Sequence, residues 1–478
     1  MQKGDVIEGL KIERMAAEGK CITHVEGQVL FLTGGAPEDL VTVQVTKIKK
    51  SFLEGKVIRI EQPSPYRTNP FCEHFGICGG CAWQHLDYGL QLENKKQQVI
   101  DNFERIGGLI FPPVQNILPS EKIRHYRNRL DFSFSSQRWL TPLELRQQVE
   151  NSSLFNTPAL GFHLPRMFDK ILDLKNCYLQ PNPSNAIRLA LKDESLKHNI
   201  PFFNIRKKEG FLRTLTIRSN NEGQVMVILQ VYYKKQAWID LLFKKLKNDF
   251  PQISSFLYII NEKGNDSFQD QEVLTWSGED FLMESLMDAH RKEKLKFKIG
   301  PKSFFQTNTL QAEKLYRSTW EMAQFQGHER VYDLYTGTGS IACYVARDVK
   351  KVIGLEYVEE AVADARMNAE RNQIHNASFF AGDIAQLLND EFIAQHGHPD
   401  VVITDPPRNG MHEKVCAMLL KIRPEKIIYV SCNPATQARD LKWLAEAYTI
   451  EAIQPVDMFP HTIHVENIVR LKLKNSAP

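Results

Sequence analysis

The last third of this sequence alternates between apolar runs and segments with helical periodicity. Five apolar runs follow one another beyond about residue 300: VYDLY, KVIGLEY, ASFFAGD, DVVITD and KIIYVSC. Short apolar runs separated by helical segments are typical of parallel strands joined by crossover helices. The alternation therefore predicts an α/β domain on a parallel sheet over residues 296–478.

The rest of the chain predicts two further domains of different character. Residues 1–61 form short alternating runs punctuated by glycine and proline, which is the pattern of a small β-barrel. Residues 62–295 are mostly strand-like and predict an antiparallel, mixed α+β domain. A helix is expected at 92–108, where Gly107 and Gly108 supply a C-terminal stop, and it is a candidate to pack on the last domain.

Three features of the sequence predict a cytoplasmic protein. The N-terminus MQKGDVIEGL lacks the apolar run of a signal peptide, and no stretch stays apolar long enough to span a bilayer. The eight cysteines are then expected to be reduced thiols rather than a disulfide framework. Three of them lie in one short loop, which suggests a metal or cluster site.

The charge pattern favours a polyanionic partner, although the formal net charge is only +3. Any one basic run is most simply a solvated face, but four such runs in one chain favour nucleic acid. The runs lie at 47–56, 121–129, 205–213 and 290–302.

A nucleotide-type site is predicted where the first apolar run of the C-terminal domain ends. Gly337 and Gly339 follow VYDLY and let the backbone pass close to a ligand. Glu356 ends the next run, where an acid can hydrogen-bond both ribose hydroxyls, and Asp383 ends the third. A Gly-x-Gly turn alone would be weak evidence for a ligand site, because it can simply be a tight turn between a strand and a helix. Without a loop that grips a pyrophosphate, the site suits S-adenosylmethionine better than NAD.

An acid and a thiol follow the fourth and fifth runs. Asp405 ends DVVITD, and Cys432 ends KIIYVSC just before Asn433 and Pro434. Ligands in open α/β sheets bind outside the carboxyl ends of the strands, so both side chains should face one crevice. A cysteine there is often only a small core residue, but at the crevice mouth it is placed as a nucleophile. Its pKa should then be lowered, because the thiolate is the attacking form.

These groups match the needs of methyl transfer to a pyrimidine carbon. Carbon 5 of uracil is a poor nucleophile until a thiolate adds to carbon 6. The carbon 5 proton must leave afterwards, which requires a base. His464 and Glu466 precede the last apolar run and could supply it. Alone, Glu466 would be an ordinary surface carboxylate, so its significance comes from Cys432 and Asp405.

The sequence resembles the family of S-adenosylmethionine-dependent RNA uracil-5 methyltransferases over essentially its whole length. The motifs that carry the resemblance are SFFQTN (303–308), YTGTGS (335–340), DPPR (405–408), SCNP (431–434) and HVEN (464–467). The resemblance implies a Rossmann-like class I methyltransferase domain that forms 5-methyluridine.

The resemblance also implies a role for each site residue. Cys432 would be the covalent nucleophile and Glu466 the base that removes the carbon 5 proton. Family members usually have Cys and Asn where this chain has Thr336 and Ser340. The contacts to the methyl donor would come from six residues: Gln306, Tyr335, Ser340, Glu356, Asp383 and Asp405.

Two accessory parts resemble parts of the same family. Residues 1–61 look like the TRAM domain, an RNA-binding barrel of the OB type. Four cysteines resemble the iron–sulfur loop of the ribosomal-RNA branch, in which four thiolates hold a [4Fe–4S] cluster. From spacing alone, a zinc site with four cysteines would compete nearly equally. The four are Cys72, Cys78, Cys81 and Cys177.

These parts imply an RNA partner, with 23S ribosomal RNA favoured over transfer RNA by family likeness, and a monomer is expected. The barrel and basic runs would contact phosphates, and the target base would be splayed out to reach Cys432. Phe75 and Trp83 could stack on exposed bases, or they could shield the cluster.

Three other classes of enzyme and one non-catalytic class of protein fit the sequence less well. An amino-group methyltransferase would follow Asp-Pro-Pro with an aromatic residue and need no thiol, but here Arg408 follows and Cys432 is present. A cytosine-5 methyltransferase is disfavoured by Glu466. A radical enzyme using the same donor would show C-x3-C-x2-C. A non-catalytic RNA-binding protein with a degenerate domain is disfavoured because Gln306, Asp405 and both reacting residues are intact.

Overall fold

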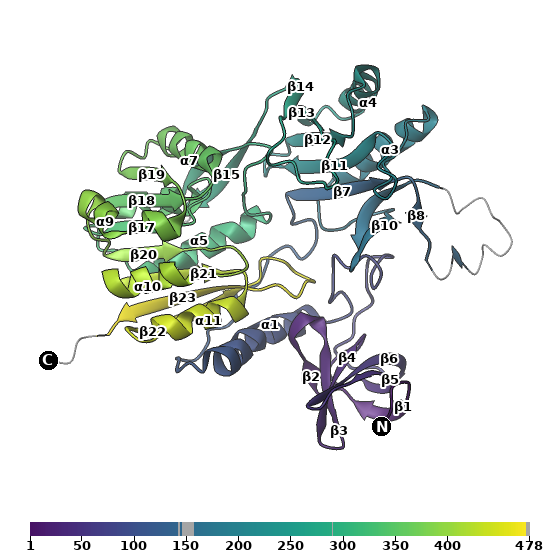
Figure 1. Cartoon of the computed structure of the whole chain (residues 1–478), viewed down its shortest axis with the longest axis horizontal. Helices are drawn as coiled ribbons and strands as arrows, with labels where there is room; N and C mark the ends of the chain where they lie inside the picture. Colours follow the sequence, from purple (N-terminus) through teal and green to yellow (C-terminus); the bar gives the residue numbers. More distant parts are fainter. Residues whose placement is uncertain (142–143, 146–156, 289, 475–478) are drawn as a thin grey trace.

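The structure, a computed structural model, describes residues 1–141, 144–145, 157–288 and 290–474. Figure 1 shows three parts: an N-terminal barrel, a central sheet with its helices, and a C-terminal domain of a sheet between helices. Among the described residues, no helix has the length and apolar character needed to cross a membrane.

The N-terminal part is a six-stranded sheet that curls into a small barrel, in the order β1-β5-β6-β4-β3-β2. Its strands alternate buried and exposed residues, as Leu30 and Leu32 illustrate on β4. Trp83 and Leu86, from the segment that follows the barrel, pack into the same core. The strands are β1 (Val6–Lys11), β2 (Arg14–Met15), β3 (Cys21–Val25), β4 (Gln28–Thr33), β5 (Leu40–Ile48) and β6 (Phe52–Gln62), with the 3-10 turn η1 (Ala17–Gly19) between β2 and β3.

The helix expected at 92–108 begins earlier and packs on the C-terminal domain. It is α1 (Tyr88–Asn102), started by an Asp87 N-cap and continued by one wide turn, η2 (Phe103–Gly107). Gly108 ends it in the left-handed conformation at φ 58°. The helix lies beside the last strands of the C-terminal domain in Figure 1, and its buried side chains join that domain's core.

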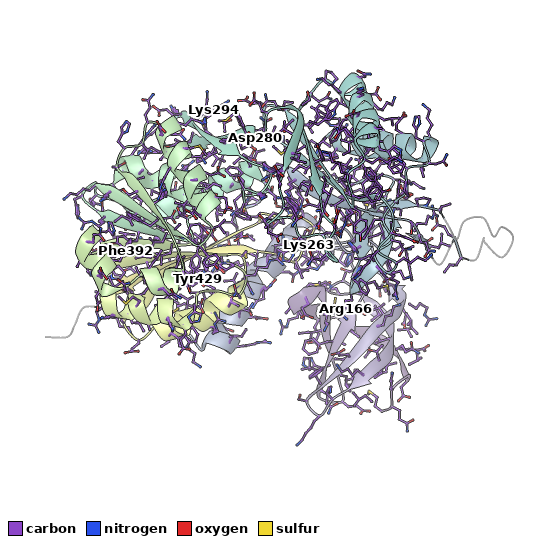
Figure 2. All side chains as sticks on the ribbon, turned by 45° about the horizontal axis from the view of Figure 1, so that its top comes forward. Arg166, Lys263, Asp280, Lys294, Phe392 and Tyr429 are labelled. Atoms are coloured by element: carbon purple, nitrogen blue, oxygen red, sulfur yellow. The ribbon has the colours of Figure 1, made fainter. Side chains whose placement is uncertain are left out.

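The central part is an eight-stranded sheet in the order β14-β13-β12-β11-β7-β9-β10-β8. We expected an antiparallel region, and most pairs are antiparallel, but two pairs are parallel. These are β10 with β8, and β12 with β13, between which helix α4 crosses. The turn between β9 and β10 is marked by Arg166 in Figure 2. The elements are β7 (Arg129–Ser135), β8 (Arg138–Trp139), β9 (Ala159–Leu164), β10 (Met167–Asp173), α3 (Ser184–Lys197), β11 (Leu212–Ser219), β12 (Val225–Val231), α4 (Gln236–Asp249), β13 (Ile253–Ile260) and β14 (Leu274–Gly278).

A hairpin and a helix connect the central part to the last domain. The hairpin joins β15 (Leu282–Asp288) to β16 (Glu293–Ile299), and α5 (Thr309–Ala323) follows. Asn368 of α7 (Glu359–Arg371) and Asn372, its C-cap residue, accept hydrogen bonds from β16 main-chain amides at 2.8 Å, so the hairpin is fixed to the C-terminal domain.

The C-terminal sheet confirms the predicted α/β domain of Rossmann-like type. Its order is β19-β18-β17-β20-β21-β23-β22, and all neighbours are parallel except β23, which runs antiparallel to both of its neighbours. Tyr429, labelled in Figure 2, lies inside this domain, and its hydroxyl donates to the Asp440 carboxylate at 2.6 Å. The strands are β17 (Arg330–Leu334), β18 (Lys351–Glu356), β19 (Ala377–Ala381), β20 (Val401–Thr404), β21 (Lys426–Ser431), β22 (Tyr448–Val456) and β23 (Glu466–Leu473).

Helices cover both faces of this sheet with separate apolar layers. One layer includes α5 and α7, and the other includes α1. The remaining helices are α6 (Ser340–Val345), η5 (Ala346–Asp348), α8 (Ile384–Leu387), α9 (Asp390–His396), α10 (Glu413–Ile422) and α11 (Pro434–Leu444).

Candidate active site

The turn between β17 and α6 leaves open space beside the carboxyl ends of the strands. Tyr335, Gly337 and Gly339 all take positive φ values, of 63°, 56° and 77°. A side chain at Gly339 would stand 3.0 Å from Ala365, so this glycine lets the turn lie against α7. Nothing lies within 4 Å of the Cβ position of Gly337, so a ligand can approach the backbone there.

The acids that were predicted to hold the methyl donor end β18 and β19. Glu356 accepts hydrogen bonds from the amides of Gly337 and Val358, both at 3.0 Å, which fix its carboxylate beside the glycine turn. Asp383 is exposed and caps α8 by accepting from the Ala385 amide at 2.9 Å. Both stand at the carboxyl edge of the sheet, where ligands of such folds bind.

Asp405, Cys432 and Glu466 come together because two strands end and a third begins at one place. Asp405 follows β20 and Cys432 follows β21. β23 runs in the opposite direction, and Ser431 pairs with Asn467, so the start of β23 lies beside the end of β21. Glu466 is therefore brought next to the thiol, although 33 residues separate them in the sequence.

Burial and neighbouring carboxylates raise the pKa of all three groups. Burial, with the charge of Asp405, raises the pKa of the Glu466 carboxyl to about 8, and Arg408 opposes this shift. Burial and the charge of Asp333 raise the pKa of Asp405 to about 7. In a site of low polarity, neutral carboxyls are favoured over carboxylates unless a cation is present.

The expected lowering of the Cys432 pKa is wrong for the protein without ligands. Burial and the charges of Glu466 and Asp405 raise the pKa of this thiol to about 11, against a smaller opposing effect of Arg408. A thiolate beside two carboxylates in a half-buried site has too little positive charge to stabilise it. The thiol is therefore protonated near neutral pH until a cation or a proton acceptor arrives.

Two polar side chains at the site were not foreseen as functional. The Tyr316 hydroxyl of α5 lies 2.9 Å from the Ser340 hydroxyl, and its ring is buried. Asp333 of β17 is also buried, and its pKa is raised to about 7 by desolvation even though it accepts a 2.5 Å bond from Thr336. Tyr316 lies within an amphipathic helix, where the periodicity indicates only burial.

The loop that carries Gln306 is held by the central part. Asn128 donates from its side chain to the Gln306 carbonyl at 2.9 Å and from its backbone to the Thr307 carbonyl at 2.8 Å. Arg218, which is buried, donates to the carbonyls of Gly300 and Ser303 at 2.7 and 3.1 Å. No local sequence pattern marks these partners, because they lie far from the loop along the chain.

His464, the other candidate base, lies near the site as a neutral imidazole. Burial lowers its pKa to about 4, and the positive charges of Arg408, Lys95 and Arg127 add to the effect. An imidazole that is already neutral can accept a proton only weakly at such a pKa. Glu466 is thus the stronger candidate.

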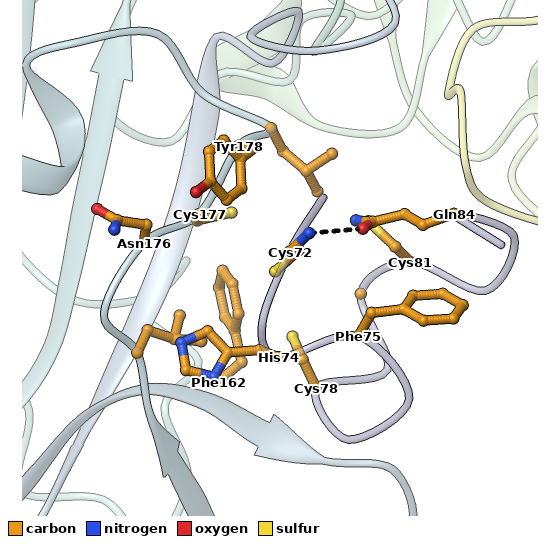
Figure 3. A pocket seen from close by; sticks show the side chains of 13 residues that line it. Cys72, His74, Phe75, Cys78, Cys81, Gln84, Phe162, Asn176, Cys177 and Tyr178 are labelled. Atoms are coloured by element: carbon orange, nitrogen blue, oxygen red, sulfur yellow. Dashed lines mark hydrogen bonds between the residues drawn. The ribbon is translucent and has the colours of Figure 1, made fainter. Parts of the chain in front are cut away.

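The four predicted cysteines line one pocket. Figure 3 shows Cys72, Cys78 and Cys81 on one loop, facing Cys177 from the segment after β10. Burial raises the pKa of the Cys78 thiol, and the charges of the other three thiols raise it further, which indicates that they are close. Even so, among the described residues, no group of three or more His, Cys, Asp or Glu side chains is placed so that it could hold a metal ion.

The two aromatic residues of this region differ in exposure. Phe75 lines the cysteine pocket and is half-buried. Trp83 is only 2% exposed and packs in the barrel core, so the prediction that it could stack on RNA bases is wrong. Its ring closes the junction between the barrel and the cysteine segment instead.

The strand order, the glycine turn after β17 and the acid at the end of β18 are the features of a domain that takes a methyl group from S-adenosylmethionine. The family model for tRNA (uracil-5-)-methyltransferases matches residues 268–474, and the TRAM domain model matches residues 2–58. The chain belongs to the family of S-adenosylmethionine-dependent RNA uracil-5 methyltransferases. This confirms the family and its TRAM domain as predicted from the sequence.

Similar proteins match this chain from end to end. An uncharacterized RNA methyltransferase of Bacteroides thetaiotaomicron is 48% identical over 96% of this chain and 100% of its own length. A second one, from Porphyromonas gingivalis, is 48% identical over 97% of this chain and 99% of its own. The crystal structure of Pyrococcus abyssi tRNA (uracil-54, C5)-methyltransferase with S-adenosyl-L-homocysteine is 29% identical, with a TM-score of 0.73 over 97% of this chain and 100% of that one.

Proposed function

We propose that this enzyme methylates carbon 5 of a uridine in 23S ribosomal RNA through a covalent bond between Cys432 and carbon 6 of the base. The observation that carries the proposal is the pairing of β21 with β23, which brings the Cys432 thiol beside the Glu466 carboxyl. A nucleophile and a base are both needed on the pyrimidine ring, and few other methyl transfers need this pair.

The reaction uses the two groups in sequence. The Cys432 thiolate adds to carbon 6, and the electrons of the ring double bond move onto the carbon 4 oxygen. Carbon 5 of this enolate then takes the methyl group, whose bond to the donor sulfur breaks. The Glu466 carboxylate removes the carbon 5 proton, the ring double bond re-forms, and the Cys432 thiolate leaves.

The raised pKa values fit this sequence if charge arrives with the methyl donor. Near neutral pH, the Cys432 thiol and much of Glu466 are protonated in the free protein. A sulfonium is positively charged, so its binding favours the ionised forms of both groups. Asp405, with a pKa near 7, can accept the thiol proton as the RNA binds.

Six residues are proposed to hold the methyl donor. Glu356 would bind the ribose, since its carboxylate stands beside the open space at Gly337. Ser340 would act together with Tyr316, to which it is hydrogen-bonded. The six are Gln306, Tyr335, Ser340, Glu356, Asp383 and Asp405.

We also propose that Cys72, Cys78, Cys81 and Cys177 hold a [4Fe–4S] cluster. Their side chains line one pocket but are not placed around a single ion. In a cluster each thiolate binds a different iron, so the sulfurs stand farther apart than around one zinc ion. Such a cluster would join the cysteine loop to the segment after β10, and no step of methyl transfer requires it.

The RNA target and the working unit follow from the same parts. We propose that 1–61 is the RNA-binding barrel, 62–295 the central domain and 296–478 the catalytic domain, working as a monomer. Family likeness favours 23S ribosomal RNA when a barrel and four cysteines occur together. A transfer RNA uridine is the second candidate, because the similar Pyrococcus abyssi enzyme acts on uracil 54 of tRNA.

Two experiments test the reaction and its target. With RNA containing 5-fluorouridine and S-adenosylmethionine, the protein should form an adduct that survives denaturation, since fluorine cannot leave as the proton does. Cys432→Ala should form none, and an undiminished adduct with this variant would contradict the mechanism. Mapping 5-methyluridine in 23S and transfer RNA of a deletion strain then identifies the target.

The cluster is tested by the metal content of anaerobically purified protein. We expect iron and acid-labile sulfide, with broad visible absorption that is lost in Cys78→Ser. Stoichiometric zinc without iron would overturn this part of the proposal and leave the methyl transfer untouched.

A further inference from the structure

The loop between β22 and β23, residues 457–465, ends directly at Glu466. Six of its nine residues are buried and none is exposed, although connecting loops normally run over the surface. A buried loop needs partners for its backbone groups, because an unpaired buried carbonyl is costly. The partners therefore reveal what fixes the shape of this loop.

The loop carbonyls are bound by side chains from three other segments. Lys95 of α1 donates to the Phe459 carbonyl at 3.0 Å. The Tyr126 hydroxyl donates to the Pro460 carbonyl at 3.0 Å, and Asn308 donates to the Met458 carbonyl at 2.9 Å. The donor and acceptor of each bond are more than 100 residues apart in the sequence, so residues outside β22 and β23 fix the shape of the loop.

A buried ion pair anchors the start of the loop. Lys95 lies 2.5 Å from the Asp457 carboxylate, and both side chains are fully buried. Tyr88, the first residue of α1, donates to the same carboxylate at 2.8 Å. A buried ion pair adds little stability over apolar residues of equal size, but it fixes geometry.

A second anchor holds the middle of the loop to the cysteine segment. Gln91 of α1 accepts from the His461 amide at 2.9 Å and contacts its imidazole at 3.2 Å. The His461 carbonyl accepts from the amides of Ala82 and Trp83, at 2.8 and 3.0 Å. Ala82 directly follows Cys81, so the pocket of four cysteines and the loop share a hydrogen-bonded backbone.

The barrel touches the same loop. A Cβ atom at Gly19 would meet Ile463 at 3.0 Å, and Ile463 packs against the barrel core. The loop that ends at Glu466 is thus contacted by the barrel, the cysteine segment, α1 and the central part.

We propose that Lys95 and Gln91 are positioning residues for Glu466: through the 457–465 loop they hold its carboxyl where the carbon 5 proton must be removed. The inference rests on the proposed function, in which Glu466 is the base. Loosening the loop should slow removal of the carbon 5 proton and release of Cys432. Addition to carbon 6 and methyl transfer should stay nearly unchanged, because Cys432 and the donor-site residues lie on other elements.

The test separates these steps in a single turnover of the full-length protein on uridine RNA. One variant is the double substitution Lys95→Met with Asp457→Asn, which removes both charges and leaves neither buried alone. The second is Gln91→Leu. The matched control is Lys96→Met, the same change one residue along α1, where the lysine only meets Asn116 at the surface. Methylated RNA and the denaturation-resistant adduct are followed separately in time.

We expect methyl transfer within about threefold of wild type and adduct release slowed about tenfold or more, since a displacement near 1 Å can cost about a hundredfold. The adduct then accumulates, as it should in Glu466→Gln, and Lys96→Met behaves as wild type. Release at the wild-type rate in both variants overturns the inference, and so does an equal fall of both steps, which indicates general loosening. If wild-type protein forms no adduct even with 5-fluorouridine RNA, the proposed function itself fails.

Discussion

The side-chain amide of Asn433 donates a hydrogen bond to the main-chain carbonyl of Arg408 over 2.9 Å. The bond joins the turn after β21 to the turn after β20, so the segments that carry Cys432 and Asp405 are tied together. Asn433 also caps α11, because its side-chain oxygen accepts from the Ala435 amide at 3.1 Å. One residue therefore stabilises a helix and helps to fix the spacing of the nucleophile and the acid.

Two substitutions at Asn433 should separate these roles. Asn433→Ser keeps a good capping oxygen but is too short to reach Arg408, so stability should change by less than about 0.5 kcal/mol. Its adduct formation with 5-fluorouridine RNA should nevertheless fall about tenfold, because the residue next to Cys432 no longer binds the turn after Asp405 and only Thr436 still donates to the Arg408 carbonyl, at 3.1 Å. Asn433→Ala should lose both roles and about 1 kcal/mol of stability. Equal activity in the serine variant and wild type would show that the link to Arg408 does not matter.

The reactivity of Cys432 should follow its raised pKa. Because the pKa is about 11 in the free protein, alkylation by iodoacetamide should quicken about tenfold per pH unit between about pH 7 and about pH 9. Mass spectrometry of the peptide that contains Cys432 measures the rate apart from the other thiols. A plateau below about pH 8 would mean that the thiol is already ionised and that the pKa is low.

Replacing Glu466 by glutamine tests the charge that raises this pKa. Near pH 9 the carboxyl, whose pKa is about 8, is ionised and repels the thiolate, so Glu466→Gln should be alkylated faster than wild type. At about pH 6.5 the carboxyl is protonated, and the two proteins should react alike. The same ratio at both pH values would exclude an electrostatic effect of Glu466.

The same variant should alter the pH dependence of stability. The pKa of Glu466 is raised from 4.5 to about 8 on folding, so the unfolded chain ionises first and stability is lost as pH rises between those values. Glutamine has no such loss. As pH rises from about 6 to about 9, the free energy of unfolding of Glu466→Gln should therefore increase by roughly 1–3 kcal/mol relative to that of wild type, as measured by denaturant unfolding. A constant difference across this range would contradict the raised pKa.

The sequence predicted the parts of the site that belong to regular strand ends. Asp405 and Cys432 follow apolar runs that form β20 and β21, and parallel strands deliver their carboxyl ends to one edge. Before the family motif is considered, the sequence offers Glu466 only alongside His464 as a candidate base, since the place of Glu466 depends on β23 running antiparallel. The fold class followed from the same alternation of runs and helices.

Other features had no local signal. Asn128 binds the Gln306 loop from 178 residues away, and nothing around it marks a partner. In the segment FPHTIH, three of the six residues are buried and none is exposed, and distant side chains bind its backbone. The pKa of Cys432 was mispredicted because it depends on which charges gather around the thiol, and burial with two carboxylates outweighs Arg408. Stacking of Trp83 on bases was also mispredicted, because packing in the barrel core decides its burial.

The cysteine loop offers a matched pair of glycines for testing how the proposed cluster is supported. Gly76 and Gly79 both have positive φ values, 82° and 76°, but a Cβ atom at Gly76 would meet nothing within 4 Å. At Gly79 it would stand 2.4 Å from Pro165 in the turn between β9 and β10.

Gly76→Ala should cost only about 1–2 kcal/mol of backbone strain. Gly79→Ala adds a clash that pushes the loop away from the central sheet, and with it the three cysteines that face Cys177. After anaerobic purification, the iron content per chain should stay near the wild-type level in Gly76→Ala. It should fall at least about twofold in Gly79→Ala, because ligands must be held close to their bonding distances. Equal iron in both variants would mean that the contact with Pro165 does not hold the four cysteines together.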